Sequence, residues 1–198
     1  MPSPIGHTLA GVATAWAADL VPGDRAWRTA PATSSLYARA GGTLTLVCGA
    51  LGAAADLDLL WGGHREHTHS IGAVIFVALF AAAMAVNARR PVLRVTLMCA
   101  GAYATHILLD WLGADDFAPY GIRALWPFSN HWYISGLNVF RATQRFYMTR
   151  PEAIRANTLA IVQEVLVIGP VVVALWLIRV EALAGLAAKM ARRDHAAQ

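Results

Sequence analysis

The sequence is poor in charge. Only 14% of its 198 residues are Asp, Glu, Lys or Arg, against roughly 25% in ordinary soluble domains. Hydrophobic residues make up 57% of the chain, and the mean hydropathy is +0.47. This imbalance favours an integral membrane protein over a soluble one. The formal net charge is +4, which we interpret first as a signal of membrane topology and of contact with the lipid surface.

Several familiar motifs are also missing. No basic run reaches the density of a nucleic-acid-binding patch, so we expect no nucleic-acid partner. There is no Gly-x-Ser-x-Gly element, no supported Cys–His pair and no phosphate-binding glycine loop. The two cysteines, Cys48 and Cys99, lie in apolar segments, where we expect them to be buried small apolar residues. A hydrolase built on this chain would therefore depend on metal-activated water.

Long apolar stretches predict an all-α, polytopic membrane bundle with four to five transmembrane helices. The expected helices cover residues 4–20, 36–55, 71–86, 92–112 and 157–178. The first is short for a span, which needs about 20 residues. Residues 113–156 are rich in aromatics and form an expected interfacial segment. No internal repeat is visible, and the length suggests one membrane-embedded domain over residues 1–198.

A polar stretch at residues 56–70 lies between two apolar segments and contains two aspartates and three histidines. Asp56 and Asp58 are both candidate metal ligands. Because alternate residues cannot easily reach one ion, one of them would bind directly while the other orients a ligand histidine, and the sequence leaves open which. Of the histidines, His64 and His69 are the expected ligands, and the middle one is the expected bystander.

A second ligand pair lies later in the chain. His106 and Asp110 are four residues apart on a predicted helix, so both side chains project from one face. Imidazole and carboxylate together suit zinc, and manganese or iron would also fit. The alternative is a histidine hydrogen-bonded to an aspartate within the membrane, without a metal. Ionisable residues in membrane segments are costly and usually functional, so two such sets together favour a metal site.

An alternating up-and-down path places all these candidates at one end of the bundle. His7 at the start of the first helix and Glu164 in the last helix fall at the same end. Of the 16 Lys and Arg residues, ten fall at the opposite end and six at the ligand end. The positive-inside rule therefore places the candidate metal site on the extracytoplasmic side. Glu164 is a candidate ligand, base or partner of an arginine.

Three arginines are candidate phosphate partners. Arg65 lies among the histidines and is either a surface cation or a guanidinium fork that holds a phosphate or carboxylate beside the metal, and we favour the fork. Arg123 and Arg141 lie in the aromatic segment. His131 lies there too, and the sequence does not decide its role.

The candidate ligands fall into short motifs: an early His, Asp-Leu-Asp, His-Arg-x-x-Thr-His-Ser, His-x-x-x-Asp and Leu-Trp-Pro. These stand at His7, Asp56-Leu57-Asp58, His64-Arg65-Glu66-His67-Thr68-His69-Ser70, His106-Ile107-Leu108-Leu109-Asp110 and Leu125-Trp126-Pro127. As a set they resemble the YdjM-like family of bacterial inner-membrane, metal-dependent hydrolases, over roughly residues 5–130. The sequence departs from that family at Ala55, where a proline often precedes the first aspartate.

That family is distantly similar to the bacterial zinc-dependent phospholipase C and the fungal zinc nucleases, all-helical enzymes that cleave phosphate esters with a zinc cluster. The similarity implies a set of zinc ligands in this chain, with Asp110 as the bridging residue. Mapped by order, these are His7, Asp56 or Asp58, His64 or His69, His106 and Asp110. The further His and Glu ligands of those enzymes have no match at the right spacing, so one or two zinc ions are expected.

These patterns together predict a hydrolase of the bacterial inner membrane that acts on a phosphoester, such as a phospholipid or another phosphorylated substrate. The expected catalytic residues are Asp56, Arg65 and Glu164. The alternative is a metal- or proton-coupled transporter without hydrolytic activity, in which Glu164 and His106 act as relay groups. A site that binds haem through two histidines is a third interpretation.

Overall fold

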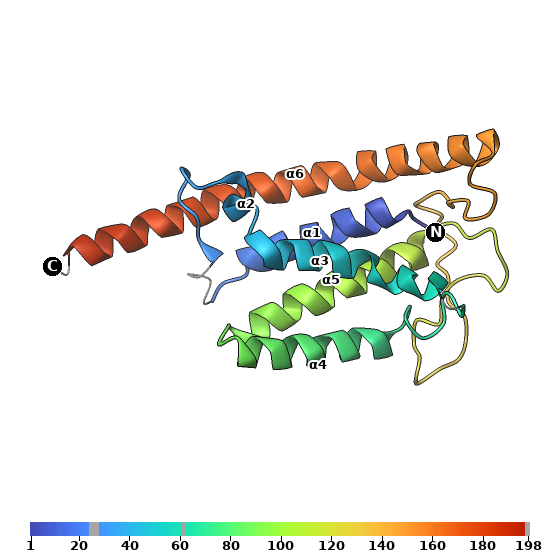
Figure 1. The fold of residues 1–198 in the computed structure, drawn as a ribbon, viewed down its shortest axis with the longest axis horizontal. Coiled ribbons are helices and arrows are strands. Elements are labelled where there is room, and N and C mark those ends of the chain that lie inside the picture. Colours follow the sequence, from blue (N-terminus) through green and yellow to red (C-terminus); the bar gives the residue numbers. More distant parts are fainter. Residues whose placement is uncertain (24–27, 61, 197–198) are drawn as a thin grey trace.

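The regular structure of the chain is helical (Figure 1). The computed structural model describes residues 1–23, 28–60 and 62–196. Its elements are α1 (Pro4–Leu20), α2 (Leu36–Arg39), α3 (Gly42–Ala53), the 3₁₀ helix η2 (Ala54–Leu60), α4 (Ile71–Asn87), α5 (Val92–Leu112) and α6 (Pro151–Ala196). Within the described ranges there is no β-strand. Two isolated β-bridges, Gly113–Phe140 and Ile122–Tyr133, lie in the segment between α5 and α6. The predicted all-α fold is confirmed.

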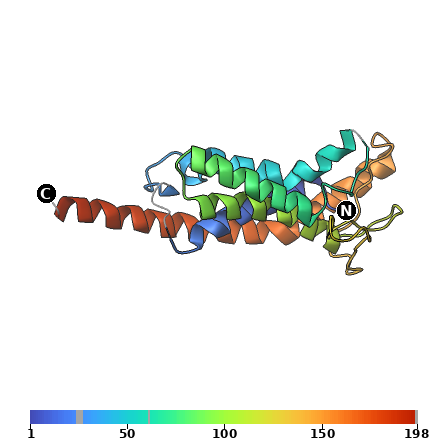
Figure 2. The same cartoon turned by 90° about the horizontal axis from the view of Figure 1, so that it is seen from below.

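The helices form one elongated bundle. α1, α3 and α5 pack against one another, α4 lies against α5, and α6 lies against α1 (Figures 1 and 2). α6 runs along the whole bundle and projects beyond it at the C-terminal end. The N-terminus, η2 and the long connection between α5 and α6 gather at the other end. We call this the ligand end, because the candidate metal ligands lie there.

Three helical stretches are long and apolar enough to cross a membrane, namely residues 42–60, 92–112 and 151–193. α4 is a shorter apolar helix of 17 residues, and its side chains Phe76, Leu79 and Phe80 are exposed on the bundle surface, as expected of a lipid-facing helix. The predicted membrane bundle is therefore confirmed. α1 also has 17 residues, fewer than the roughly 20 that a full span needs.

Three predicted helices have nearly the observed bounds, and two differ. The stretch predicted as one helix over residues 36–55 is divided into α2 and α3, because Gly41 and Gly42 have φ angles of 96° and 62°, which glycine adopts more readily than other residues. The last helix continues through Pro170 to Ala196, beyond the predicted end at residue 178. Arg25, which the charge count includes, lies outside the described residues.

Two glycines allow α1 and α3 to pack closely. A Cβ atom at Gly52 would clash with the carbonyl oxygen of His7 and lie 3.2 Å from the Cα atom of Gly11. A Cβ atom at Gly11 would in turn clash with the carbonyl oxygen of Cys48. Small residues permit this backbone approach between membrane helices. The contact fixes the first turn of α1, and with it His7, against the end of α3.

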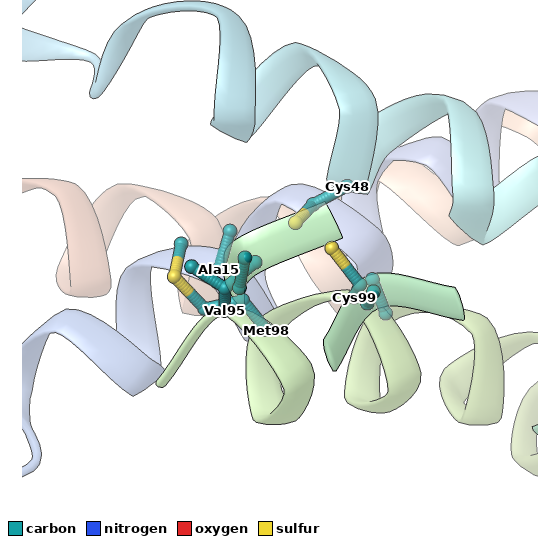
Figure 3. Close-up of a cluster of buried hydrophobic side chains, with 8 residues drawn as sticks. Ala15, Cys48, Val95, Met98 and Cys99 are labelled. Carbon is teal, nitrogen blue, oxygen red and sulfur yellow. The ribbon is translucent and has the colours of Figure 1, made fainter. Parts of the chain in front are cut away.

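The apolar core lies between α1, α3 and α5, near the middle of the bundle. It includes Ala15, Cys48, Val95, Met98 and Cys99, and Figure 3 shows the sulfur atoms of the two cysteines facing each other. Both cysteines are buried and free. They therefore occupy the core as small apolar residues, as the sequence predicts.

Buried polar contacts attach α6 to both ends of α1. At the ligand end, the carboxylate of Glu164 accepts hydrogen bonds from the Ser3 amide, at 2.7 Å, and from the Ser3 hydroxyl. At the opposite end, Arg179 donates to Asp19 at 2.7 Å, and Arg28 also pairs with Asp19 at 2.8 Å. These contacts hold the long last helix in register with the helix that carries His7.

Candidate metal centre

Six of the predicted ligands come together at the ligand end, five in one cluster and His64 beside it. His7 lies in the first turn of α1, Asp56 in η2, His69 just before α4, and His106 and Asp110 in the last two turns of α5. Four of the five side chains are almost completely buried, while Asp56 is 20% exposed. Residues more than 100 positions apart thus form one compact cluster.

The spacing of the ligand atoms fits a metal site. The Nε2 atoms of His69 and His106 are 3.1 Å apart, and Asp110 Oδ2 lies 3.4 and 3.3 Å from them. Asp56 Oδ1 lies 3.5 Å from His69 Nε2 and 3.6 Å from His106 Nε2. Four ligand atoms bound tetrahedrally to zinc at about 2.0 Å would be about 3.3 Å apart. The residues present therefore fit a four-ligand ion.

His7 extends the cluster on the other side of Asp110. Its ring stacks on that of His106 with centroids 3.7 Å apart, and its Nε2 atom lies 3.3 Å from Asp110 Oδ1. Both ring nitrogens of His7 and both carboxylate oxygens of Asp110 are buried without a hydrogen-bond partner. Buried polar atoms without partners are rare in native proteins, and a bound metal ion would satisfy these atoms.

Hydrogen bonds on the far side of each ring orient the central histidines. His106 Nδ1 lies 2.8 Å from the carbonyl oxygen of Gly52, which can only accept, so Nδ1 carries the proton. His69 Nδ1 lies 3.2 Å from Asp58 Oδ2. In both rings the Nε2 atom is directed into the cluster. This is the usual arrangement of a metal-binding histidine, whose other nitrogen donates to a carboxylate or carbonyl.

Asp58 lies behind the histidines, outside the ligand groups, although it was predicted as a ligand. Its Oδ1 atom is 2.8 Å from His64 Nδ1, and its Oδ2 atom accepts from the Thr68 hydroxyl at 2.6 Å and the Arg65 amide at 3.1 Å. These partners engage both oxygens. In the structure, Asp56 thus faces the cluster and Asp58 lies behind His64 and His69, and a direct bond from either aspartate to a metal stays a prediction.

The ligands form two adjacent groups. Ligand atoms of His7, His106 and Asp110 lie within 4.8 Å of one another, and so do those of Asp56, His64 and His69. The second group is more exposed than the first. Two groups of three ligands, each leaving a position for a water molecule or a substrate, are consistent with the predicted one or two ions.

The family model of the YdjM inner membrane protein matches residues 1–188. The chain belongs to the YdjM inner membrane protein family. No curated protein and no solved structure matched the chain. The match over residues 1–188 covers more of this YdjM family member than the resemblance over residues 5–130, because it also includes the second half of the aromatic segment and most of α6.

The environment of His69 changes its proton affinity. Burial lowers the pKa of His69, but its hydrogen bonds to the carboxylates of Asp56 and Asp58 outweigh burial and raise the pKa to about 9. Without a metal, His69 therefore carries a proton at neutral pH. A metal ligand must be a neutral imidazole, so metal binding would release this proton.

The long segment between α5 and α6 fixes the position of His69. Ser70 caps α4 by accepting from the Ala73 amide at 3.2 Å. The amides of Ile71 and Gly72 donate to the carbonyl oxygens of Ala124 and Trp126 at 2.8 and 2.9 Å. These contacts satisfy the first N–H groups of α4, which have no partner within the helix. The aromatic segment is therefore part of the site's support.

The two predicted catalytic residues Arg65 and Glu164 are occupied by structural contacts. Arg65 is buried, pairs with Asp115 and donates to the carbonyl oxygen of Phe117 at 3.1 Å. Glu164 binds the backbone and hydroxyl of Ser3 and lies outside both ligand groups. Both residues position the segments around the cluster. Neither side chain has a recorded contact with the ligand atoms, so their catalytic roles stay predictions.

The remaining candidates lie outside the ligand groups as well. His67 and His131 are exposed, and His67 packs edge-on against Trp126 with centroids 4.8 Å apart. Arg123 pairs with Glu66 at 3.2 Å. The role of His67 as a bystander stays a prediction.

A cavity of about 710 Å³ adjoins the ligands. Asp56, His64, Arg65 and Arg145 contribute to its lining, together with residues of the N-terminus, the aromatic segment and the start of α6. Sequence reasoning did not select Arg145, because no motif or helical spacing distinguishes it from the other arginines of this segment. Its proximity to the ligands depends on how the long connection folds back.

Proposed function

We propose that this YdjM family member is a membrane-bound, metal-dependent hydrolase that cleaves a phosphoester. The observation that carries the proposal is the convergence of His69, His106, Asp110 and Asp56 atoms at separations of 3.1–3.6 Å. Zinc suits this mixture of imidazole and carboxylate ligands best, and manganese or iron also fit. One ion in the buried group, or two ions shared through Asp110, agree with the available ligand atoms.

The residues of the cluster would have three roles: holding the ion, orienting its ligands and accepting a proton. A divalent ion bound here would act as a Lewis acid, making a water molecule more acidic and polarising the phosphoryl group. His69, His106 and Asp110 would hold it and leave the fourth position to water, with His7 on the other oxygen of Asp110, while the Gly52 carbonyl oxygen and Asp58 keep the rings of His106 and His69 oriented. Asp56 is the partly exposed carboxylate at the cavity wall, so it is the residue placed to accept a proton from the attacking water.

The distribution of buried polar groups supports hydrolysis at the ligand end rather than transport through the bundle. Among the described residues, the core between the ligand end and the ion pairs of Asp19 with Arg28 and Arg179 is apolar, and it includes Ala15, Met98 and Ala102. A proton or metal pathway would need ionisable or polar side chains along this stretch. This arrangement favours a reaction at the surface of the bundle.

The ligand end faces the extracytoplasmic side in our proposal. Arg39, Arg89, Arg90 and Arg94 lie at the opposite end of the bundle, near the start of α3, the end of α4 and the start of α5. An excess of arginine next to spanning helices is typical of the cytoplasmic side. Labelling of a cysteine introduced at exposed His131 by an impermeant thiol reagent in intact spheroplasts tests this orientation. Protection from the reagent would contradict it.

Hydrolysis of bis(p-nitrophenyl) phosphate by the purified, zinc-loaded protein tests the reaction class. We expect turnover that stops on chelation, returns with zinc and is lost in His106→Ala. The matched control is His131→Ala, which removes an exposed histidine outside both ligand groups and should keep the activity. Turnover that survives both chelation and His106→Ala would contradict the proposal.

A further inference from the structure

The cavity beside the ligands combines charged and apolar walls. Its volume of about 710 Å³ lies within the usual range for small-molecule sites, roughly 300–1,000 Å³. Asp56 and His64 connect it to the candidate metal centre. Leu59, Phe117, Phe146, Met148 and Ile161 supply apolar surface to the same lining. The cavity is therefore suited to a molecule that is polar at one end and apolar at the other.

Arg145 differs from the other arginine of this cavity. Arg65 is paired with Asp115 and with the carbonyl oxygen of Phe117. Arg145 has no hydrogen-bond or ion-pair partner among the described residues, and its Nε atom is buried. Its guanidinium group lies 4.9 Å from the Phe117 ring centroid and 5.5 Å from that of Phe146. The two rings hold the group in place while its N–H donors stay available.

The charge environment of Arg145 favours an anion. Burial and the positive charge of Arg65 lower the pKa of Arg145, and they outweigh the nearby carboxylates of Asp115, Asp56 and Asp58, which raise it. A guanidinium group beside a second one, partly removed from water, is stabilised by a bound anion. Its planar fork matches the oxygens of a phosphate in a bidentate contact.

The apolar lining indicates what the anion is attached to. Leu59 and Met148 line the cavity and are still 51% and 61% exposed. An inorganic ion would make no use of this surface. A hydrocarbon chain lying along Phe146, Met148 and Leu59 would cover it, and each methylene group removed from water would tighten binding.

We infer that this cavity binds an amphiphilic phosphoester, with its phosphate between Arg145 and the Asp56 wall and its apolar part along Phe146 and Met148. The reaction of this ligand rests on the proposed function. The contact with Arg145 does not, because the guanidinium group requires no metal to bind an anion.

Calorimetric titration of the purified protein with methylphosphonate and hexylphosphonate tests the inference. Both probes resist hydrolysis, and they share one head group. The protein is measured zinc-loaded and after treatment with EDTA, as wild type, Arg145→Gln and Arg145→Lys. The matched control is Arg150→Gln, because Arg150 also lies over an aromatic ring, Tyr147, at 4.4 Å, but does not line the cavity.

We expect Arg145→Gln to weaken the binding of both probes at least tenfold, with and without zinc. Arg145→Lys should lose less, and Arg150→Gln should stay within twofold of wild type. Hexylphosphonate should bind at least tenfold more tightly than methylphosphonate. Equal affinities in wild type and Arg145→Gln would overturn the assignment of Arg145, and equal affinities of the two probes would overturn the amphiphilic class.

Metal content separates this inference from the proposed function. If no variant binds zinc but Arg145 still determines phosphonate affinity, the anion site stands and the metal-dependent hydrolase does not. If zinc binds and phosphodiester hydrolysis proceeds, but the Arg145 variants bind both probes as wild type does, the inference alone fails. Hexanoate that binds more tightly than hexylphosphonate would assign the cavity to carboxylates and overturn the phosphoester class.

Discussion

The Nε2 atoms of His69 and His106 lie 3.1 Å apart, although 37 positions separate the two residues in the chain. One precedes α4, and the other lies in the second half of α5. Two imidazoles aimed at one point, with Asp110 Oδ2 3.4 and 3.3 Å away, repel unless a proton or a metal ion lies between them.

Asp58→Asn should weaken zinc binding without abolishing it. Asp58 accepts hydrogen bonds behind His64 and His69, and replacing such an orienting carboxylate typically costs about 10–100-fold in metal affinity. Asp110→Asn should remove stoichiometric zinc, because it replaces a carboxylate within the cluster. Competition with a fluorescent chelator measures both affinities. An equal loss in the two variants would place Asp58 among the direct ligands.

Zinc affinity should rise with pH. The pKa of His69 is about 9 in the metal-free protein, so its proton must leave for the metal to bind at any lower pH. The affinity should increase up to about tenfold per pH unit below pH 9 and level off above it. Chelator competition between pH 6 and 8 provides the measurement, with correction for the chelator's own protonation. An affinity that is constant over this range would contradict the assigned role of His69.

Glu164→Gln should lower the unfolding temperature while leaving the zinc content unchanged. The substitution removes one of the two carboxylate oxygens that accept from the Ser3 amide and hydroxyl, and a buried hydrogen bond to a charged group contributes about 1.5–3 kcal/mol. Thermal unfolding monitored by circular dichroism, with metal analysis of the same sample, tests this. Lost zinc at an unchanged unfolding temperature would instead support a direct role of Glu164 at the metal.

Gly52→Ala should destabilise the fold and displace His7. The new Cβ atom would meet the carbonyl oxygen of His7 and the Cα atom of Gly11, and overpacking of this kind costs about 1–3 kcal/mol. The matched control is Gly185→Ala, another helical glycine, whose added Cβ atom would meet nothing within 4 Å. That variant should be neutral or slightly stabilised, since alanine is the better helix former. Equal unfolding temperatures for the two variants would contradict the close α1–α3 contact.

Much of the fold follows from local patterns in the sequence. The bounds of α1, α4 and α5 follow from apolar runs with clear ends, such as the Ser70 cap. The break at Gly41 and Gly42 was missed because two glycines within an apolar run do not reveal their left-handed backbone. The predicted last helix already includes Pro170, but the continuation of α6 beyond residue 178 was not predicted, because the tail after Arg179 has little apolar periodicity.

The candidate ligands could be found from residue type and spacing, but their division of roles could not. Asp56 and Asp58 are equivalent in sequence, and only the hydrogen bonds of Asp58 to His64, Thr68 and the Arg65 amide separate them. The part played by the Gly52 carbonyl oxygen depends on the approach of α3 to α5. Arg145 joins the cavity through a long irregular connection, for which helical periodicity gives no prediction.

The metal content of the purified protein tests the central claim most directly. Elemental analysis of wild type, Asp110→Asn and His131→Asn, each loaded with zinc and dialysed against a weak chelator, compares a cluster ligand with an exposed residue outside it. We predict one or two zinc ions per chain in wild type and His131→Asn, and fewer in Asp110→Asn. Wild-type protein that retains no stoichiometric zinc, manganese or iron would contradict the account.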